Sequence, residues 1–310
     1  MRTWRTMKTR SILLIGYGSI GKRHARNLIE MGLTPFILTK HPDDLNATFL
    51  NDVSELGGRN IEYCIICSPT SEHLDSLKKC LSLKHGPKKI LIEKPLEATY
   101  AKGIQVKKIS EKFDVEIFVA YNLRFLEVFK TIRGFLEKNK GIRIVEIVAG
   151  QDLKEWRSAR DYTRSYSAHR EQGGGVDLDL SHEIDYVLWL FGDKIIDKMM
   201  YRKKISDLEI DSPDIFKLFL RYERFVVDVT LDYIRKPKTR YIRIICENGE
   251  NLYYDFTTNR IDIRTRETTF ADSIGQSYKR MLMSFLADET NKRKLCTIEE
   301  GLKVLKILEV

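Results

Sequence analysis

The chain has 310 residues, of which 43% are hydrophobic and 31% are charged, and its formal net charge is +9. This length suits one large or two ordinary domains, and the composition indicates a globular protein with a substantial core. The positive charge is spread over short lysine pairs, and no basic run alternates with aromatic residues, which argues against nucleic-acid binding. A positive field would still attract a phosphorylated or carboxylated substrate.

The five cysteines do not form a disulfide framework. Cys64 and Cys67 have the spacing of a redox or metal pair, but they lie in an apolar segment typical of a buried strand. We therefore expect no metal site, and reduced thiols suit the cytoplasm. The basic first ten residues lack a following apolar signal core, and the apolar run at 12–15 is too short to span a membrane. The sequence predicts a cytoplasmic protein without a membrane partner.

The first third of the chain alternates between expected strands and helices. Strands separated by helices indicate a parallel sheet with right-handed crossovers. We therefore predict a doubly wound α/β domain over residues 1–122. Its expected strands are 11–15, 35–39, 61–67, 88–92 and 115–120, with a short segment near 49–56, and its expected helices are 19–31, 71–83 and 98–112.

The pattern changes after an expected helix at 124–138. Consecutive strands without helices between them indicate an antiparallel sheet, and Asn248-Gly249 is a hairpin signal between two of them. The expected strands are 142–149, 196–202, 214–221, 225–233, 241–246, 252–255 and 260–264; one helix at 177–191 interrupts them, and helices at 274–288 and 297–308 close the chain. Thr297 and Glu300 form a capping box for the last helix. We predict a second, α+β domain over residues 123–310 with an open-faced, mainly antiparallel sheet, whose C-terminal helices could pack back on the first domain.

An apolar strand runs directly into Gly16-x-Gly18-x-x-Gly21, and an amphipathic helix follows. Gly16 allows a tight turn, Gly18 lets the backbone approach a pyrophosphate, and Gly21 lets the helix pack close to the strand. The anion would lie on the positive end of the helix. This loop therefore predicts a dinucleotide-binding site in a Rossmann-type domain.

Two further strand ends carry polar residues at the edge of the sheet where ligands bind. Ser68-Pro69-Thr70 and His73 follow one strand, and this turn caps the next helix, contacts a cofactor, or does both. Glu93-Lys94-Pro95 follows the next strand. These charges either pair at the surface or meet a ligand, and a lysine there can stabilise developing oxyanion charge. The proline allows a cis peptide bond that would fix the direction of the lysine.

The last strand of the first domain ends before Asn122 and Arg124, which project where the sheet opens. A final cluster begins with three glycines and continues through Asp179, His182 and Asp185. These three residues fall at i, i+3 and i+6, on one face of the expected helix. Carboxylates one turn to either side can orient the histidine and move its pKa toward neutrality. Metal binding is the alternative interpretation, but no second histidine or cysteine lies nearby.

These four motifs, in this order, resemble the glucose-fructose oxidoreductase, inositol dehydrogenase and MocA (Gfo/Idh/MocA) family over nearly the whole chain. The resemblance implies a Rossmann domain followed by an open-faced sheet domain, with Lys94 of the Glu-Lys-Pro motif as a catalytic residue. Asp179 and His182 match the family's aspartate–histidine pair, although three residues separate them here where four are common. The resemblance further implies dinucleotide binding at Gly16, Gly18 and Gly21, and a nicotinamide ribose near Ser68-Pro69-Thr70 and His73.

The segment between Asp152 and Ser167 is rich in arginine, tyrosine and tryptophan. It resembles a form of the family found among bacterial surface-polysaccharide and nucleotide-sugar enzymes. Aromatic side chains stack on sugar rings or a uracil, and arginines bind phosphate or carboxylate; the alternative is a packed surface loop with ion pairs. The predicted substrate-binding residues are Arg124, Trp156, Arg157, Tyr166, Asp179 and His182.

The second expected strand ends in Thr39-Lys40, where an acidic residue would bind the ribose hydroxyls of NAD. A hydroxyl and a cation there favour a 2′-phosphate, so we expect an NAD(P) cofactor, with NADP slightly preferred. The predicted cofactor-binding residues are Gly16, Tyr17, Gly18, Ser19, Ile20, Gly21, Thr39, Lys40, Ser68, Pro69, Thr70, His73, Glu93, Lys94 and Asn122.

The sequence thus predicts an NAD(P)-dependent dehydrogenase that transfers a hydride between nicotinamide and a hydroxyl or keto carbon of a sugar or nucleotide sugar, with a UDP-sugar favoured. His182 would take the hydroxyl proton, Lys94 would stabilise the oxygen, and Asp179 would orient His182. The alternatives are a ketone or imine reductase, a non-catalytic dinucleotide-binding sensor, and a cofactor-binding assembly protein. The presence of both the lysine and the histidine favours the enzyme. Because an open-faced sheet leaves one side to cover, we expect a homodimer or homotetramer through the C-terminal sheet.

Overall fold

The computed structural model describes residues 10–158, 161–264, 266–287 and 294–309. The chain forms two compact units: the first joins the residues up to Asn122 to those from Ser277 onward, and the second comprises Leu123–Gln276. In this division the C-terminal residues from Ser277 onward belong to the first unit. Most of the basic N-terminal segment, residues 1–9, lies outside the described residues. None of the helices in the described ranges is long and apolar enough to cross a lipid bilayer.

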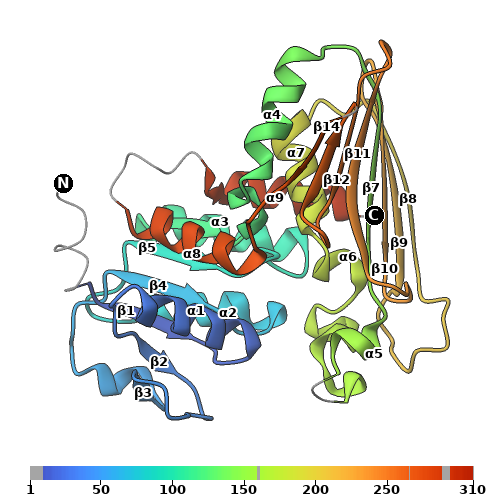
Figure 1. The fold of residues 1–310 in the computed structure, drawn as a ribbon. Helices are drawn as coiled ribbons and strands as arrows, with labels where there is room; N and C mark the ends of the chain where they lie inside the picture. Colours follow the sequence, from blue (N-terminus) through green and yellow to red (C-terminus); the bar gives the residue numbers. More distant parts are fainter. Residues whose placement is uncertain (1–9, 159–160, 265, 288–293, 310) are drawn as a thin grey trace. The chain divides into compact units, whose positions relative to one another are not determined.

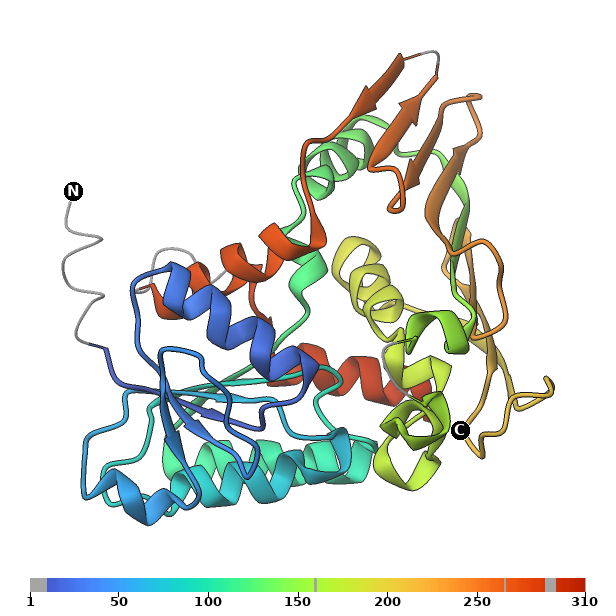
Figure 2. The ribbon, with the colours of Figure 1, turned by 60° about the horizontal axis from the view of Figure 1, so that its bottom comes forward.

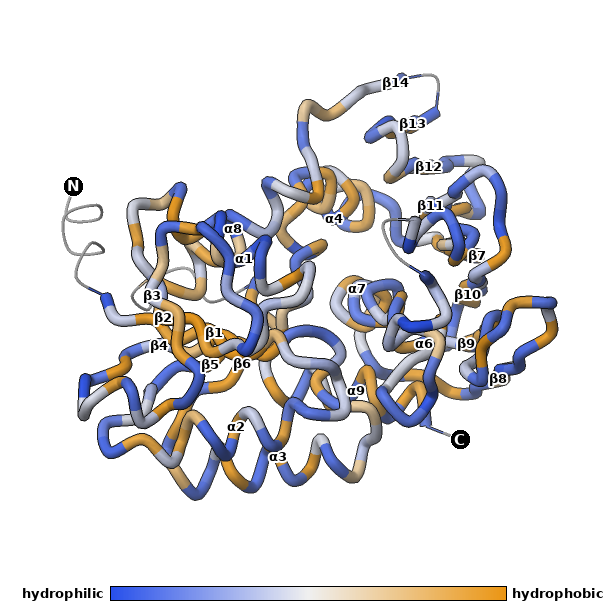
Figure 3. Tube along the Cα trace, turned by 90° about the horizontal axis from the view of Figure 1, so that it is seen from below, coloured by the Kyte–Doolittle hydropathy of each residue, from blue (hydrophilic) through white to orange (hydrophobic). Residues whose placement is uncertain are grey.

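The first unit is built on a sheet of order β15-β6-β5-β4-β1-β2-β3 in the described part of the chain (Figure 1). Neighbouring strands pair in parallel, except for β15 and β6. β1 and β4 are buried along their whole length, as expected of a parallel sheet covered on both faces, and Figure 3 shows these strands as apolar. The strands are β1 Ile12–Ile15, β2 Phe36–Leu38, β3 Thr48–Leu50, β4 Tyr63–Ile66, β5 Lys89–Ile92, β6 Glu116–Val119 and β15 Cys296–Thr297.

Helices cover both faces of this sheet (Figure 2). On one face, the ring of Tyr278 in α8 lies edge-on to His24 of α1, and Phe285 of α8 packs against Tyr63 and Phe118. On the other face, α3 contacts α2 and α9. The predicted capping box of α9 is confirmed, because Thr297 and Glu300 each cap the other's backbone N–H. The helices are α1 Ser19–Glu30, α2 His73–Leu81, α3 Tyr100–Phe113, α8 Ile274–Leu286 and α9 Ile298–Leu308.

The second unit is built on a sheet of order β14-β13-β12-β11-β7-β10-β9-β8 in the described residues. Its strands pair antiparallel, except for the parallel pair β7 and β10. The predicted fold class, a doubly wound parallel sheet joined to a mainly antiparallel one, is therefore confirmed. The strands are β7 Ile142–Gly150, β8 Asp197–Lys203, β9 Ile215–Arg221, β10 Val226–Asp232, β11 Thr239–Cys246, β12 Asn251–Asp255, β13 Arg260–Ile263 and β14 Arg266–Thr269.

The two faces of this second sheet differ in character because side chains alternate along each strand. Val145, Ile147 and Ala149 of β7 point to one face and are buried. That face carries helices: Phe129 of α4 meets Tyr186 of α7, and both rings contact Phe256 after β12. The opposite face is open. The helices of this unit are α4 Val128–Lys138, α5 Leu153–Trp156, α6 Val176–Asp179 and α7 His182–Phe191.

The expected single helix at 177–191 is wrong, because the chain forms two helices, α6 and α7, separated by Leu180 and Ser181. Leu180 leaves the helical region with φ −104° and ψ 28°, and Glu183 N donates to Leu180 O in a tightened i→i−3 turn. Asp179 and His182 therefore do not share one continuous helical face. The strands β14 and β15 and the helix α5 were not expected from the sequence, since all three are short.

Glu97 is a buried carboxyl group that the sequence does not single out. The side chain is fully buried after β5; Oε2 accepts a hydrogen bond from the Ala98 N–H, and Oε1 has no partner among the described residues. Burial raises the pKa of Glu97 to about 7. The neutral form is thus favoured in the folded protein.

This environment predicts a pH-dependent stability. A carboxyl whose folded pKa is raised stabilises the fold fully below its unfolded pKa of 4.5, and this stabilisation is lost as the pH rises through about 7. We expect Glu97→Gln to raise the free energy of unfolding, measured by urea denaturation, by at most about 3 kcal/mol at pH 8. At pH 5 the substitution should leave it nearly unchanged. Glu62→Gln, at an exposed position, is the control. Equal effects of Glu97→Gln at both pH values would contradict the assignment.

Candidate functional site

The three glycines of the loop between β1 and α1 fall into two classes. A Cβ on Gly16, whose φ is +93°, would lie 2.6 Å from the Ser68 nitrogen, and a Cβ on Gly21 would lie 2.2 Å from the Gly16 oxygen. Packing within the protein therefore requires these two glycines. A Cβ on Gly18 would meet nothing within 4 Å, and Gly18 has a negative φ. The described protein atoms therefore do not require glycine there, and the space beside Gly18 is open to a bound group.

The N-terminus of α1 is suited to bind an anion. Gly18 is its N-cap and supplies no side-chain cap, and the first turn contains no acidic residue. The first backbone N–H groups of a helix have no partners within the helix and carry a partial positive charge. With the open space at Gly18, this arrangement fits the pyrophosphate of a dinucleotide.

An acidic residue lies beside the glycine loop although the end of β2 has none. Asp43 accepts hydrogen bonds from the Tyr17 hydroxyl at 2.8 Å and from Lys22 Nζ at 3.0 Å. Burial and the neighbouring carboxylate raise the pKa of Tyr17 to about 12. Lys40 is exposed, and the hydroxyl of Thr39 accepts a hydrogen bond from the His41 N–H at 3.1 Å. The sequence analysis missed Asp43 because it follows the strand end by several residues.

The turn after β4 does not cap the following helix. Neither the 3-10 turn Thr70–Glu72 nor α2 has a side-chain cap. The Ser68 and Ser76 hydroxyls lie 2.9 Å apart. His73 is buried, with Nδ1 3.2 Å from the Leu96 oxygen and Nε2 3.1 Å from the Ser68 oxygen, and burial lowers its pKa. The imidazole thus joins this turn to the one after β5.

The turn after β5 carries Glu93 and Lys94, and the Lys94–Pro95 peptide bond is cis. Glu93 is 5% exposed, so it does not form a surface pair with its neighbour. Its Oε1 lies 2.7 Å from His24 Nε2, and its Oε2 accepts a hydrogen bond from the Lys94 N–H at 3.2 Å. Asn122, at the end of the same sheet, is fully buried and donates to the Ser277 hydroxyl at 2.7 Å.

In the second unit, the segment that contains α6 and α7 buries four carboxylates and pairs each with arginine. Their side chains are at most 2% exposed. The pairs are Asp177 with Arg170 and Arg202, Asp179 with Arg157, Glu183 with Arg240, and Asp185 with Arg124. Buried charges are tolerated when they are paired and hydrogen-bonded, so these arginines neutralise the segment. We call this set the carboxylate–arginine cluster.

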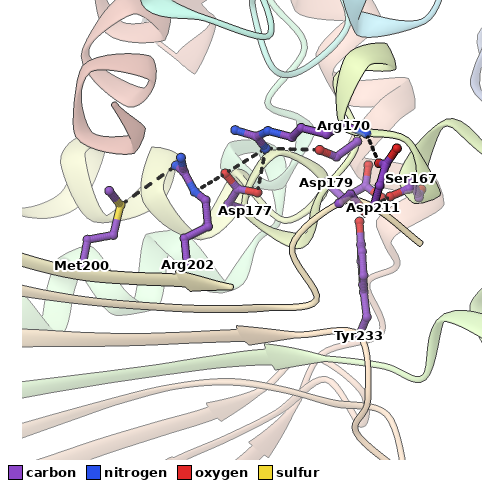
Figure 4. Close-up of polar contacts among 10 residues, drawn as sticks. Ser167, Arg170, Asp177, Asp179, Met200, Arg202, Asp211 and Tyr233 are labelled. Atoms are coloured by element: carbon purple, nitrogen blue, oxygen red, sulfur yellow. Dashed lines mark hydrogen bonds and ion pairs between the residues drawn. The ribbon is translucent and has the colours of Figure 1, made fainter. Parts of the chain in front are cut away.

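Asp179 lies at the centre of a hydroxyl network (Figure 4). Its Oδ2 accepts hydrogen bonds from the Ser167 and Tyr233 hydroxyls, each at 2.6 Å, and its Oδ1 accepts one from the Tyr166 hydroxyl at 2.6 Å. Burial and the nearby carboxylate raise the pKa of both tyrosines. Asp179 therefore fixes the loop that carries Tyr166 and Ser167. No sequence signal connects Tyr233 to Asp179, since 54 residues separate them.

Of the other predicted substrate residues, Trp156 and Arg157 contact this network. Arg157 stacks on the rings of Trp156 and Tyr166 and donates to the Ser167 hydroxyl at 2.7 Å. Trp156 lies edge-on to Tyr233. Arg124 is 2% exposed and makes a bidentate pair with Asp185, at 2.9 and 2.7 Å, which gives it a structural role. His182 is the first residue of α7 and is 7% exposed.

The chain also matches two models of one known protein family. The model of the Gfo/Idh/MocA oxidoreductase family for the NAD-binding Rossmann fold matches residues 10–121, and its model for the C-terminal alpha/beta domain matches residues 146–310. The chain belongs to this family. As a member, it is an oxidoreductase with an NAD-binding Rossmann domain, and the open space at Gly18 fits that cofactor.

Individual members of the family are distant from this chain. The oxidoreductase YrbE of Bacillus subtilis is 23% identical over 95% of this chain and 91% of its own length. Myo-inositol 2-dehydrogenase of Thermotoga maritima is 26% identical over 64% of this chain and 59% of its own length. Among solved structures, the WlbA dehydrogenase of Bordetella pertussis, in complex with NADH and UDP-GlcNAcA, is 18% identical with a TM-score of 0.78 and covers 96% of this chain and 94% of its own. That likeness shows a shared fold.

The glycine loop provides a test of cofactor binding. We expect Gly18→Ala to fold with an unchanged Tm, because its Cβ meets no protein atom, but to bind NADH at least tenfold more weakly, a loss of about 1.4 kcal/mol. Gly21→Ala should lower the Tm instead, because its Cβ would overlap the Gly16 oxygen. NADH fluorescence titration and thermal unfolding measure the two effects. Unchanged NADH affinity in Gly18→Ala would contradict this assignment.

Proposed function

We propose that the protein is an NAD(P)-dependent dehydrogenase that transfers a hydride between nicotinamide and a hydroxyl-bearing carbon of a sugar or nucleotide sugar. The observation that carries the proposal is Lys94, held beside a buried carboxylate at the end of β5 in the NAD-binding unit. Two relatives support the substrate class: one is named as an inositol dehydrogenase, and one was crystallised with a UDP-sugar. The arginine- and aromatic-rich loop favours a UDP-sugar, because arginines bind phosphate and aromatic rings stack on sugar or uracil.

The proposed mechanism assigns one task to each side chain. The nicotinamide, when bound, supplies the acceptor for the hydride. His182 removes the proton from the substrate hydroxyl, while the Lys94 ammonium donates a hydrogen bond to the same oxygen and stabilises it as it becomes a carbonyl oxygen. In the reverse direction, His182 returns the proton to a ketone oxygen.

Asp179 acts in this proposal as a positioning residue for His182. Its carboxylate is held by three hydroxyl groups, and it lies immediately before the turn that leads to His182. The same contacts fix the loop that carries Trp156, Arg157 and Tyr166, which we propose as a wall of the substrate site. Removing the carboxylate would loosen both the histidine and this wall.

The two catalytic assignments predict matching losses of activity. We expect Lys94→Ala and His182→Ala each to lower turnover about 10²- to 10⁴-fold, because acid–base and electrostatic assistance are lost, with Tm and NADH affinity retained. Lys88→Ala and His85→Ala, at exposed positions, should leave turnover unchanged. The assay follows reduced nicotinamide with NAD⁺ or NADP⁺ and a panel of UDP-sugars, free sugars and inositols. Turnover like that of the wild type in both catalytic variants would refute the mechanism.

We also propose a slight preference for NADP, carried by the exposed cation Lys40 after β2. Lys40→Glu should lower NADPH affinity at least tenfold and leave NADH affinity within threefold, because only the 2′-phosphate would interact with position 40. Lys84→Glu, at another exposed lysine, should change neither affinity. A wild-type preference for NADH that Lys40→Glu leaves unchanged would overturn the preference.

The open face of the second sheet supports a proposal of self-association. It exposes Ile144, Met199 and Tyr201, and it contains an open hollow of about 490 Å³ lined by Glu146, Tyr241, Arg243, Tyr253 and Asp262. Exposed apolar side chains mixed with charges of both signs suit a second copy of the chain. We expect sedimentation to show a dimer or tetramer that Met199→Glu weakens and that Phe113→Glu, at an exposed apolar residue of α3, does not. A monomeric wild type would contradict this.

A further inference from the structure

The turn that carries Lys94 contacts one buried histidine before the lysine and another after it. Upstream of the lysine, Glu93 meets His24 of α1. Downstream, the Leu96 oxygen meets Nδ1 of His73 in α2. Both histidines are at most 1% exposed, and neither has a role in the mechanism proposed above.

The contact with His24 defines the direction of the Glu93 carboxylate. The Glu93 N–H donates to the Ile66 oxygen of β4 at 2.9 Å, so the backbone is fixed by the sheet. The carboxylate then bridges two groups, with Oε1 2.7 Å from His24 Nε2 and Oε2 accepting from the Lys94 N–H at 3.2 Å. The imidazole thus orients the carboxylate. The carboxylate in turn holds the backbone nitrogen of Lys94.

The surroundings of His24 select its tautomer. Nδ1 is buried and has no hydrogen-bond partner among the described residues, whereas Nε2 faces a carboxylate. A proton on Nδ1 would be an unsatisfied buried donor, so the imidazole that fits is neutral with its proton on Nε2. His24 then donates to an ionised Glu93, and the edge of the Tyr278 ring, whose centroid is 5.6 Å away, restricts rotation of the imidazole.

We propose that His24 is a positioning residue for Lys94, acting through Glu93, with His73 bracing the opposite end of the turn. The inference rests on the proposed function, because His24 is assigned the task of positioning Lys94, a residue that the proposed function makes catalytic. It also joins α1, whose N-terminus fits the pyrophosphate, to the lysine. The imidazole orients the Glu93 carboxylate by its Nε2–H.

The test compares His24→Leu with His24→Gln in the full-length protein. Leucine removes the donor, whereas the side-chain N–H of glutamine can take the place of Nε2–H. Lysines are labelled by reductive ¹³C-dimethylation, and the Lys94 signal is identified by its loss in Lys94→Arg. We expect both the chemical shift and the titration midpoint of the Lys94 signal to change in His24→Leu, since the carboxylate that accepts from the Lys94 backbone N–H is no longer held in place. His24→Gln should restore both values, and His85→Leu, at an exposed histidine, should leave both unchanged.

A second readout uses turnover with whichever substrate of the panel the wild type oxidises. His24→Leu should lower kcat at least tenfold while KM and NADH affinity stay within threefold, because the lysine is misplaced but the binding groups remain. If His24→Leu does not fold, Glu93→Asp, which shortens the carboxylate by one methylene, is measured in the same way. A lower Tm with an unchanged Lys94 signal would overturn the inference, because it is the result expected of a purely structural pair. Full turnover in Lys94→Ala would instead refute the proposed function, and the Lys94 signal would still decide the role of His24.

Discussion

The second unit depends on the burial of four carboxylates in one short segment. Asp177, Asp179, Glu183 and Asp185 are all removed from water, and an isolated ionised carboxylate in such a place is very costly. Each is paired with at least one arginine, and removing one partner of a buried pair costs about 3–5 kcal/mol. The arginines come from separate elements, which are the turn after β6, the loop after α5, and the strands β8 and β11. The segment can therefore be buried only when all of these elements are in place.

This constraint also bears on His182, which is 7% exposed in the second unit. It lies between Asp179 and Glu183, whose carboxylates are fixed by Arg157 and Arg240. The loop before the glycines is fixed by the same charges, because Tyr166 and Ser167 donate to Asp179. Ion pairs that stabilise the fold thus also determine where the proposed proton acceptor and the substrate loop lie.

In the first unit, glycines and buried histidines hold the side chains in place, as the ion pairs do in the second unit. Gly16 and Gly21 bring α1 close to β1, and this approach lets His24 reach Glu93 at the end of β5, two strands away in the sheet. His73 lies between the turns after β4 and β5, with one ring nitrogen facing the Leu96 oxygen and the other the Ser68 oxygen. Of the three loop glycines, Gly18 is the one that faces open space. In both units, buried polar contacts that are distant in sequence place the residues to which we assign catalysis.

The sequence by itself determined the parallel and antiparallel sheets, the glycine loop, and the positions of Lys94 and His182, because hydrophobic periodicity, glycine spacing and strand ends are local signals. It could not show that α6 and α7 are separate helices, since the apolar pattern runs on through Leu180, where the backbone leaves the helical region. Nor could it show that Arg124 is buried against Asp185, that Tyr233 reaches Asp179, or that His24 meets Glu93. Those partners are 54 to 69 residues apart, and only the folded chain brings them within hydrogen-bond distance.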